Sequence, residues 1–201
     1  MRFSIILFSF LFVAACSTGI NPYQFADENG TRESFTLCHG YSCTYRTPVG
    51  LNDKQWASVL KVFRKPAKTA EQEREKITRA LAKIEKYTHQ VSGLSLDKAE
   101  AASLPEDPGQ MDCIDETVNT AQALKFLETE GVFEFHKIAR PIHRGYFVDF
   151  MWPHNSAAIK EISSGQVYAV DSFFEDNGTK SHIVKKEDWM KNWSPRKNQE
   201  N

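Results

Sequence analysis

The stretch QMDCIDETVNTAQALKFLETEG, residues 110–131, decides how the rest of the chain is interpreted. Apolar side chains recur in it three or four residues apart, which predicts a helix: Ile114, Val118, Ala121, Leu124 and Leu127. Asp112 is a typical N-cap residue, and Gly131 is typical of the position just after a helix ends. Cys113 therefore stands in the first helical turn. The helix dipole there favours a thiolate, whereas the carboxylates of Asp112 and Asp115 disfavour it.

The chain that follows this helix predicts β-strands. Its apolar residues change to a spacing close to two and are rich in Val, Ile, Phe and Tyr. A turn at Ser163-Ser164-Gly165 joins the last two strands as a hairpin. The predicted strands are residues 132–138, 145–152, 157–162 and 167–174.

Two more helices are predicted before residue 110. Asn52 or Asp53 can cap the first, which Pro66 ends, and Thr69 or Glu71 can begin the second. Each has an apolar face, made by Trp56, Val59, Leu60 and Phe63 in the first and by Ile77, Leu81, Ile84 and Tyr87 in the second. Residues 93–109 predict a loop. Helices followed by an antiparallel sheet make an α+β domain.

Length and composition narrow the class of protein. The chain has 201 residues, of which 41% are hydrophobic and 25% are charged, values typical of one globular domain with a full core. The 25 basic residues and 26 acidic residues give a formal net charge of −1, and no Lys/Arg block resembles a nucleic-acid surface. We therefore expect no nucleic-acid partner.

The first 15 residues have the three parts of a secretory signal: Arg2, an apolar stretch over residues 3–12 and the small residues Val13-Ala14-Ala15. The apolar stretch is shorter than the roughly 20 residues that a transmembrane helix needs. Together with Cys16, the small residues resemble the bacterial lipobox, which implies a diacylglycerol on the Cys16 sulfur; Ser17 then implies transfer to the outer membrane. An ordinary secretory signal followed by a chance cysteine is the alternative.

This interpretation predicts a lipoprotein anchored in a membrane through Cys16, at the periplasmic face of the outer membrane. Its predicted parts are a signal peptide at residues 1–15, a polar tether at 16–35, one domain at 36–193 and a polar tail at 194–201.

The other cysteines are interpreted from this location. Cys38 and Cys43 lie in a short loop that contains Gly40, and an oxidising periplasm favours a disulfide between them. A zinc pair is the alternative, but no second Cys/His pair at zinc-finger spacing accompanies it. Cys113 is left as an unpaired thiol, which in such a compartment must be buried or used.

His154 and Asp171 are expected to be neighbours on one sheet. If Glu161 pairs with Ser164 across the hairpin turn, the same register places His154 opposite Asp171. A carboxylate at that position can orient an imidazole and stabilise its charged form.

The order of these residues resembles bacterial transglutaminase-like cysteine peptidases, which are papain-like, over residues 109–174. Gln-Met-Asp-Cys-Ile-Asp-Glu is similar to their Gly-Asp-Cys-Asp-Asp element, and Pro-His-Asn-Ser-Ala-Ala-Ile and Tyr-Ala-Val-Asp-Ser are similar to their His and Asp strands. The resemblance implies Cys113 as the nucleophile, with its sulfur about 3 to 4 Å from a ring nitrogen of the base, His154. It implies Asp171 as the orienting group and Gln110 as an oxyanion donor, although the spacing of Gln110 is shorter than in papain.

These features predict an envelope lipoprotein whose cysteine attacks amide or acyl carbonyls through a thioester, a hydrolase of the peptidase or amidase kind. Its location suggests exported proteins or peptidoglycan peptides as substrates. A non-catalytic envelope-binding lipoprotein that retained the fold, and a murein peptidase, are the alternatives. No cofactor is expected, and His136, His143 and His154 are too widely spaced to predict a zinc site.

Overall fold

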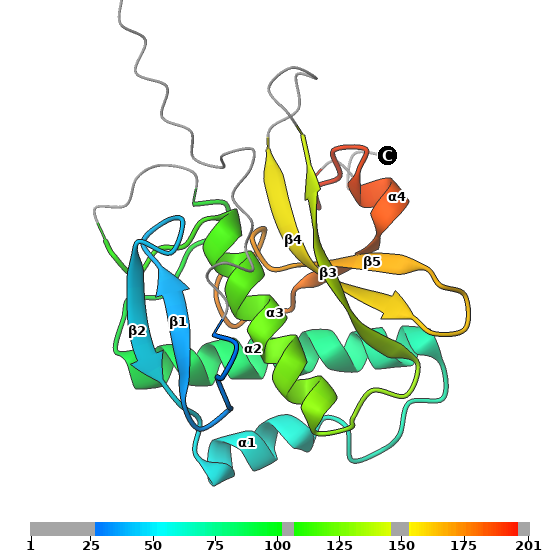
Figure 1. The fold of residues 1–201 in the computed structure, drawn as a ribbon, viewed down its shortest axis with the longest axis horizontal. Helices are drawn as coiled ribbons and strands as arrows, with labels where there is room; N and C mark the ends of the chain where they lie inside the picture. The colour runs from blue at the N-terminus through cyan, green and yellow to red at the C-terminus, as the bar shows by residue number, and fades with distance from the viewer. Residues whose placement is uncertain (1–26, 102–106, 146–152, 197–201) are drawn as a thin grey trace, which may run out of the picture.

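The computed structural model of the chain describes residues 27–101, 107–145 and 153–196 (Figure 1). The strands form two antiparallel sheets, one of order β1-β2 and one of order β3-β4-β5-β6. The predicted α+β class is confirmed. In chain order the elements are β1 Phe35–His39, β2 Tyr45–Val49, α1 Asp53–Leu60, α2 Ala70–Ser92, α3 Cys113–Thr129, β3 His136–Arg144, β4 His154–Glu161, β5 Val167–Asp171, β6 His182–Lys185 and α4 Lys186–Trp189.

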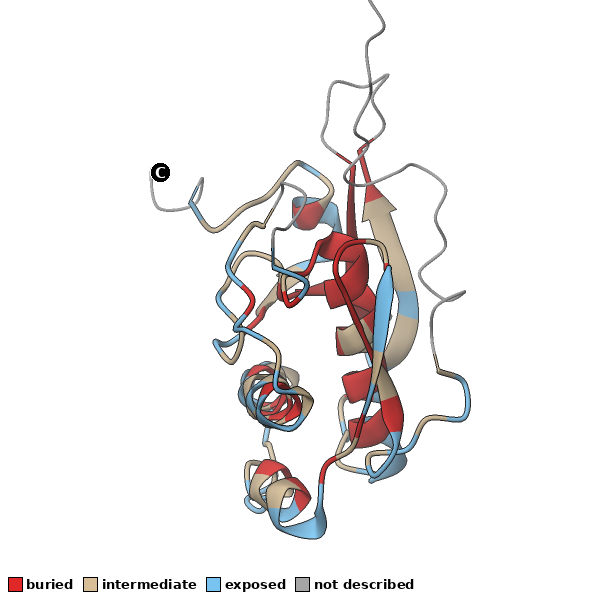
Figure 2. Ribbon diagram, turned by 90° about the vertical axis from the view of Figure 1, so that its left-hand side faces the viewer, coloured by how far each residue is buried: buried red, intermediate tan, exposed pale blue. Residues whose placement is uncertain are grey.

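Helix α3 lies at the centre of the fold. It packs against β4 of the larger sheet and against β1 of the smaller one (Figure 1). Figure 2 shows buried residues all along α3, and these include polar side chains such as Asp115, Glu116 and Thr120. A helix that is buried nearly all round must satisfy such polar groups with partners from other segments.

The helices begin where the sequence predicts. Asn52, Thr69 and Asp112 each accept a backbone N–H of the first turn of α1, α2 and α3 with a side-chain oxygen. Gly93 ends α2 in the left-handed conformation, at φ 70°, which a glycine adopts without strain. Helix α1 ends at Leu60, before the predicted stop at Pro66.

Strand β3 differs from the predicted strand at residues 132–138. It begins at His136 and continues to Arg144, past Pro141. A bulge between Ala139 and Ile142 interrupts the pairing with β4 there. Because β3 is an edge strand, the missing N–H of the proline costs no bond to a further strand.

The predicted hairpin of β4 and β5 is confirmed, but its register is not. Ala157 pairs with Val170, a shift of two residues from the pairing that would place His154 opposite Asp171. A shift of two leaves every side chain on its own face of the sheet, so His154 and Asp171 still share a face. Strand β4 begins at His154 and β5 ends at Asp171, as the resemblance to the His and Asp strands predicts, whereas the hydrophobic spacing alone predicts strands at 157–162 and 167–174.

The sequence did not reveal every element. Strand β6 and helix α4 are four residues each, too short for a hydrophobic period to be recognised. The predicted strand at residues 145–152 lies outside the described residues apart from Gly145.

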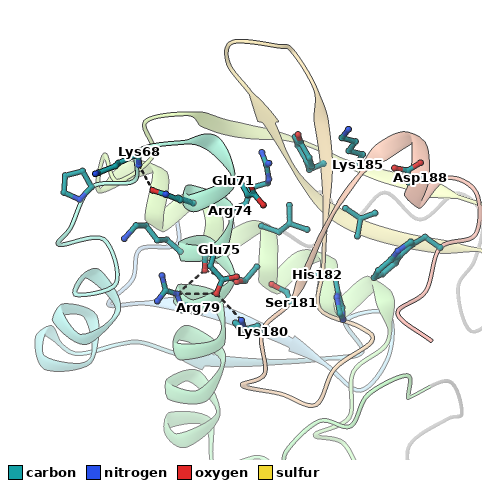
Figure 3. Close-up of a pocket in the computed structure, with 18 of the residues that line it drawn as sticks. Lys68, Glu71, Arg74, Glu75, Arg79, Lys180, Ser181, His182, Lys185 and Asp188 are labelled. Atoms are coloured by element: carbon teal, nitrogen blue, oxygen red, sulfur yellow. Dashed lines mark hydrogen bonds and ion pairs between the residues drawn. The ribbon is translucent and has the colours of Figure 1, made fainter. Parts of the chain in front are cut away.

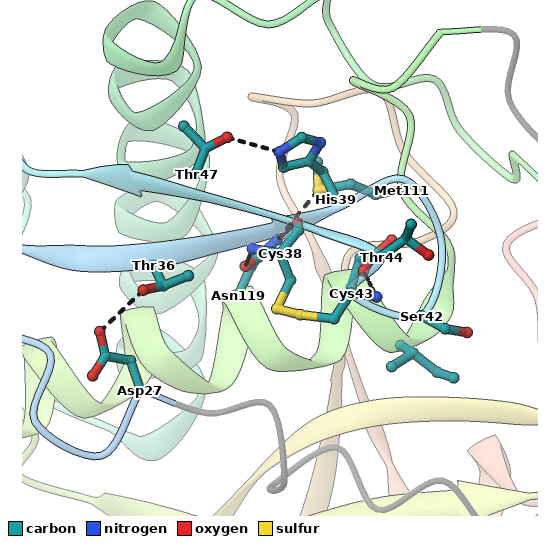
Figure 4. The surroundings of a disulfide bond; sticks show 12 residues. Asp27, Thr36, Cys38, His39, Ser42, Cys43, Thr44, Thr47, Met111 and Asn119 are labelled. Carbon is teal, nitrogen blue, oxygen red and sulfur yellow. Dashed lines mark hydrogen bonds between the residues drawn. A yellow bond between two sulfur atoms is a disulfide. The ribbon is translucent and has the colours of Figure 1, made fainter.

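The N-terminal hairpin β1–β2 was also not predicted. Its turn, residues 40–43, has positive φ at four successive residues, of which Gly40 alone is a glycine. The Cys38–Cys43 disulfide closes this turn and confirms the predicted pairing (Figure 4). His39, next to it, binds the carbonyl of Pro108 and the hydroxyl of Thr47 with its two ring nitrogens, which fixes the hairpin to the loop before α3.

The predicted signal peptide, the lipid anchor at Cys16 and most of the tether lie outside the described residues. The end of the predicted tether, residues 27–35, belongs to the fold: Phe35 opens β1, and Gln122 of α3 donates to the carbonyl of Asp27. In the described part of the chain, no helix has the length and apolar character to cross a membrane.

Candidate active site

The disulfide loop holds the N-terminus of α3. The backbone N–H groups of Tyr41 and Cys43 donate to the carboxyl of Asp115 at 2.8 and 2.6 Å. Ser42 donates its N–H and its hydroxyl to Asp112 at 3.1 and 3.2 Å. The left-handed turn thus directs its backbone donors at the two acids that flank Cys113.

These contacts change the charge expected beside Cys113. Burial raises the pKa of Asp115 to about 8, with the charge of Asp112 adding to the rise. Burial also raises the pKa of Asp112. Asp115 therefore keeps a proton at neutral pH, and the opposition of the two acids to a thiolate at Cys113 is weaker than the sequence suggests.

The helix N-terminus offers fewer donors to an anion than expected. Asp112 accepts the backbone N–H groups of both Ile114 and Asp115 at 3.0 Å with one oxygen. Two of the N–H groups that would stabilise a thiolate or an oxyanion are thus occupied by the cap itself.

Two more buried carboxyls, those of Asp97 and Glu116, lie near the start of α3. Asp97 accepts the backbone N–H of Met111 at 2.7 Å, and Glu116 accepts the hydroxyl of Ser172 at 2.6 Å. Asp97 and Glu116 are hydrogen-bonded to each other, and burial raises the pKa of Asp97 to about 8, with the charge of Glu116 adding to the rise. The hydrogen bonds of these two carboxyls to Met111 and Ser172 tie the chain before α3 to α3 and to the end of β5.

The structure brings His154 and Asp171 together, as predicted. Nε2 of His154 lies 2.8 Å from Oδ2 of Asp171, and the indole N–H of Trp189 donates to the same oxygen at 2.7 Å. Both side chains of the pair are buried, with 5% and 1% of their surface exposed. Burial raises the pKa of Asp171, but the charge and hydrogen bond of His154 and the hydrogen bond of Trp189 lower it overall, so the carboxylate is ionised.

Trp189 was not identified from the sequence, because it lies on the unpredicted helix α4. Its side chain is fully buried. The guanidinium of Arg144 lies 4.4 Å from the centre of its ring and donates to the carbonyls of Trp189 and Trp193. Arg144 therefore fixes α4, and with it the indole, against the His154–Asp171 pair.

Aromatic rings enclose His154. The ring centres of Phe173, Phe174 and Trp189 lie 5.1, 5.4 and 5.6 Å from that of His154. Phe173 also packs against the small cluster formed by Cys113 and Ile114 at the start of α3. Nδ1 of His154 makes no hydrogen bond within the described residues, and it is the ring nitrogen available for proton transfer.

The predicted approach of the Cys113 sulfur to His154 is not seen as a hydrogen bond between these two described side chains. The side-chain amide nitrogen of Asn155 lies 3.9 Å from the sulfur. Because neighbouring residues of a strand point to opposite faces, Asn155 faces α3 while His154 faces α4. In the sequence, nothing but its position next to His154 marked Asn155 as a residue of the site.

His143 orients Asn155. Its Nε2 lies 2.9 Å from the carbonyl of Gly145, so this nitrogen carries a proton, and its Nδ1 lies 3.1 Å from Oδ1 of Asn155. These two bonds hold the Asn155 side chain in place beside Cys113.

Cys113 is not the unpaired thiol that the sequence predicts. It is fully buried, and its sulfur is in a disulfide. A sulfur in a disulfide cannot act as a nucleophile, so any thiol chemistry at Cys113 belongs to its reduced form.

Gln110 does not fit the oxyanion role that the resemblance implies. Its side-chain amide donates to the carbonyl of Leu96 at 3.0 Å and accepts the N–H of Lys98 at 3.1 Å. Both ends of the amide bind this loop, so Gln110 fixes the loop and its N–H groups are not free to serve as oxyanion donors.

Another histidine–acid pair is structural. His136, fully buried, bonds Glu73 through Nδ1 at 2.8 Å, and Glu73 also accepts the backbone N–H groups of residues 134–136. Glu73 thereby ties α2 to the start of β3.

The described residues contain one group of close metal-ligating atoms, from Cys38, Cys43 and Asp115. Its sulfurs form the disulfide, and its carboxyl already accepts backbone N–H groups, so it does not fit the zinc alternative.

Comparisons of the chain with protein-family models, with curated proteins and with solved structures gave no match.

Proposed function

We propose that the protein is an envelope lipoprotein with a cysteine hydrolase site formed by Cys113, His154 and Asp171. One observation carries the proposal: the buried His154–Asp171 pair lies on the sheet that packs against α3, and Cys113 is the first residue of α3. The order of a nucleophile helix, a His strand and an Asp strand also supports a papain-like, transglutaminase-like fold.

In the proposed reaction, Nδ1 of His154 takes the proton of the Cys113 thiol, and the thiolate attacks the carbonyl carbon of an amide. The C–N bond breaks as His154 returns the proton to the leaving amine, and a thioester remains on Cys113. Water then gives a proton to His154 while its oxygen attacks the thioester, so the C–S bond breaks and a carboxylic acid leaves. Asp171 holds the imidazole and stabilises its charged form.

Two requirements follow from the geometry. Cys113 must be reduced, and, because His154 faces α4 while Asn155 faces α3, the start of α3 and the start of β4 must rearrange to bring the sulfur to His154. Asn155 then replaces Gln110 as the candidate oxyanion donor, since its amide nitrogen lies beside the sulfur. Exported proteins or peptidoglycan peptides are the proposed substrates.

A second function has its own support. Cys113 is fully buried, and aromatic rings enclose His154. These features fit a non-catalytic envelope-binding lipoprotein that kept the arrangement for stability. A murein peptidase would use the same thiol and imidazole and would differ from the first proposal only in its substrate.

Alkylation of the folded, dithiothreitol-reduced protein by iodoacetamide distinguishes these functions. We expect His154→Gln to slow the reaction of Cys113 at neutral pH by about 100-fold or more, because the thiol loses its base. The matched control is His136→Gln, which breaks the structural His136–Glu73 pair and leaves the rate unchanged in the folded protein. Equal rates in the wild type and His154→Gln, or labelling only after unfolding, would exclude the hydrolase and favour the binding protein.

The anchor is tested separately by the mass of the mature protein. A lipoprotein carries acyl chains on Cys16, and Cys16→Ala leaves the chain unlipidated. Mature wild-type protein without added mass at Cys16 would refute the anchor and leave the hydrolase proposal unaffected.

A further inference from the structure

A wide groove of about 1600 Å³ lies between α2 and strand β6, and its lining includes none of Cys113, His154 and Asp171. Figure 3 shows Glu75 and Arg79 of α2 on one wall and Ser181, His182 and Lys185 on the other. An ion pair between Lys180 and Glu75, 3.1 Å long, joins the two walls.

The groove is strongly basic. Eight Lys and Arg residues line it against three acids, Glu71, Glu75 and Asp188, in a chain whose formal net charge is −1. Lys65, Lys68 and Lys185 are exposed and make no ion pair with a described residue. A concentration of unpaired positive charge in one concave surface attracts an anionic partner.

A buried hydroxyl opens into the same groove. Ser181 is only 4% exposed, and its hydroxyl oxygen has no hydrogen-bond partner among the described residues. A buried polar group without a partner is costly, so the hydroxyl is suited to donate to an oxygen of a bound ligand. Beside Lys180, that oxygen is best supplied by an anion.

The groove also contains a free sheet edge. Strand β6 pairs with β5 on one side and is the last strand of the sheet on the other. Residues 181–185 line the groove, so the unpaired backbone groups of this edge can pair with an added strand. Edge pairing needs a polypeptide, which a lipid headgroup or a free phosphate does not supply.

We propose that the groove binds an extended, acidic segment of a partner protein as an additional strand beside β6. Ser181 and Lys185 lie four residues apart on one face of the chain, so acidic residues at alternate positions of the segment meet that face. Their carboxylates accept the Ser181 hydroxyl and pair with Lys65, Lys68 and Lys185. This site does not depend on the hydrolase proposal, because Cys113 has no part in it.

Fluorescence anisotropy with a labelled peptide of alternating Glu and Val tests the proposal at low salt. We expect the pair of substitutions Lys68→Glu and Lys185→Glu, one on each wall, to weaken binding about tenfold or more. The matched control is Lys54→Glu with Lys61→Glu, the same charge change on exposed residues of α1 and its end, and it leaves binding close to that of the wild type.

Further variants separate the parts of the site. Ser181→Ala weakens binding, a Lys-Val peptide does not bind, and N-methylation of alternate peptide nitrogens weakens binding because the main-chain bonds to β6 are lost. Cys113→Ala binds the peptide like the wild type, so failure of the hydrolase and failure of the groove are distinguishable.

Three outcomes would overturn the proposal. The first is equal weakening in the groove variant and the α1 control, which would mean a general charge effect. The second is undiminished binding of the N-methylated peptide. The third is groove-dependent binding of phosphatidylglycerol vesicles without binding of the peptide, which would assign the surface to a membrane.

Discussion

The substitution Asp97→Asn tests whether a proton is trapped behind α3. Asp97 is buried, it accepts the N–H of Met111, and it shares a hydrogen bond with Glu116. Asn keeps the oxygen that accepts the Met111 N–H, and its amide can donate to Glu116 as the protonated carboxyl does. The variant therefore imitates the protonated form but cannot lose a proton.

The sign of the effect follows from the raised pKa of Asp97. In the folded chain this pKa is about 8, whereas in the unfolded chain it is near the ordinary value of 3.8. Between these values the folded state binds a proton that the unfolded state lacks, so the free energy of unfolding falls as pH rises through this window. One such proton costs about 1.4 kcal/mol per pH unit, or about 2.7 kcal/mol between about pH 5.5 and 7.5.

Urea unfolding of the wild type and Asp97→Asn at a series of pH values measures how much the ionisation of Asp97 changes the free energy of unfolding. We expect the stability of the variant relative to the wild type to grow by about 2.7 kcal/mol over the same two pH units, or about 5 to 10 °C in Tm. Asp176→Asn is the control: Asp176 is exposed and its pKa is lowered, so its difference from the wild type stays constant. If the Asp97→Asn difference is also constant, the trapped proton is refuted.

Two other predictions concern the supports of the site. Trp189→Phe removes the indole donor to Asp171, so we expect a loss of about 1 to 3 kcal/mol in urea unfolding and slower alkylation of reduced Cys113; an unchanged stability would show that the indole bond contributes nothing. Replacing Cys38 and Cys43 together by Ser opens the loop that holds the start of α3, with an expected loss of about 2 kcal/mol. The double variant should lose less stability to dithiothreitol than the wild type, because only the disulfide of Cys113 remains to be reduced; equal losses in the two proteins would contradict this role of the Cys38–Cys43 disulfide.

Much of the helical part could be predicted because its signals are local. The caps at Thr69 and Asp112, the stop at Gly93 and the apolar spacing in α2 and α3 each depend on residues within a few positions. The strands were harder, because a strand is defined by its partner. The bulge of β3 accommodates Pro141 within the strand, and such a bulge cannot be predicted from the local sequence pattern.

In the candidate site, too, the local features could be predicted from the sequence and the long-range contacts could not. His154 and Asp171 could be predicted as neighbours because one short hairpin connects their strands, and an error of two residues in register does not separate them. The contact of Cys113 with Asn155, and the role of Trp189, depend on how α3 and α4 dock on opposite faces of the sheet. That docking is a long-range property, so spacing along the chain does not contain it.

The buried polar groups around the start of α3 explain why this site is formed only by the complete fold. The carboxyl of Asp115 is satisfied by the disulfide loop, that of Asp97 by the chain before the helix and that of Glu116 by Ser172 at the end of β5. Each partner is remote in sequence, and a buried carboxyl without its partners would cost several kcal/mol. The first turn of α3 therefore has a defined geometry only when the hairpin, the loop and the sheet are all in place, so the position of Cys113 is set by all three together.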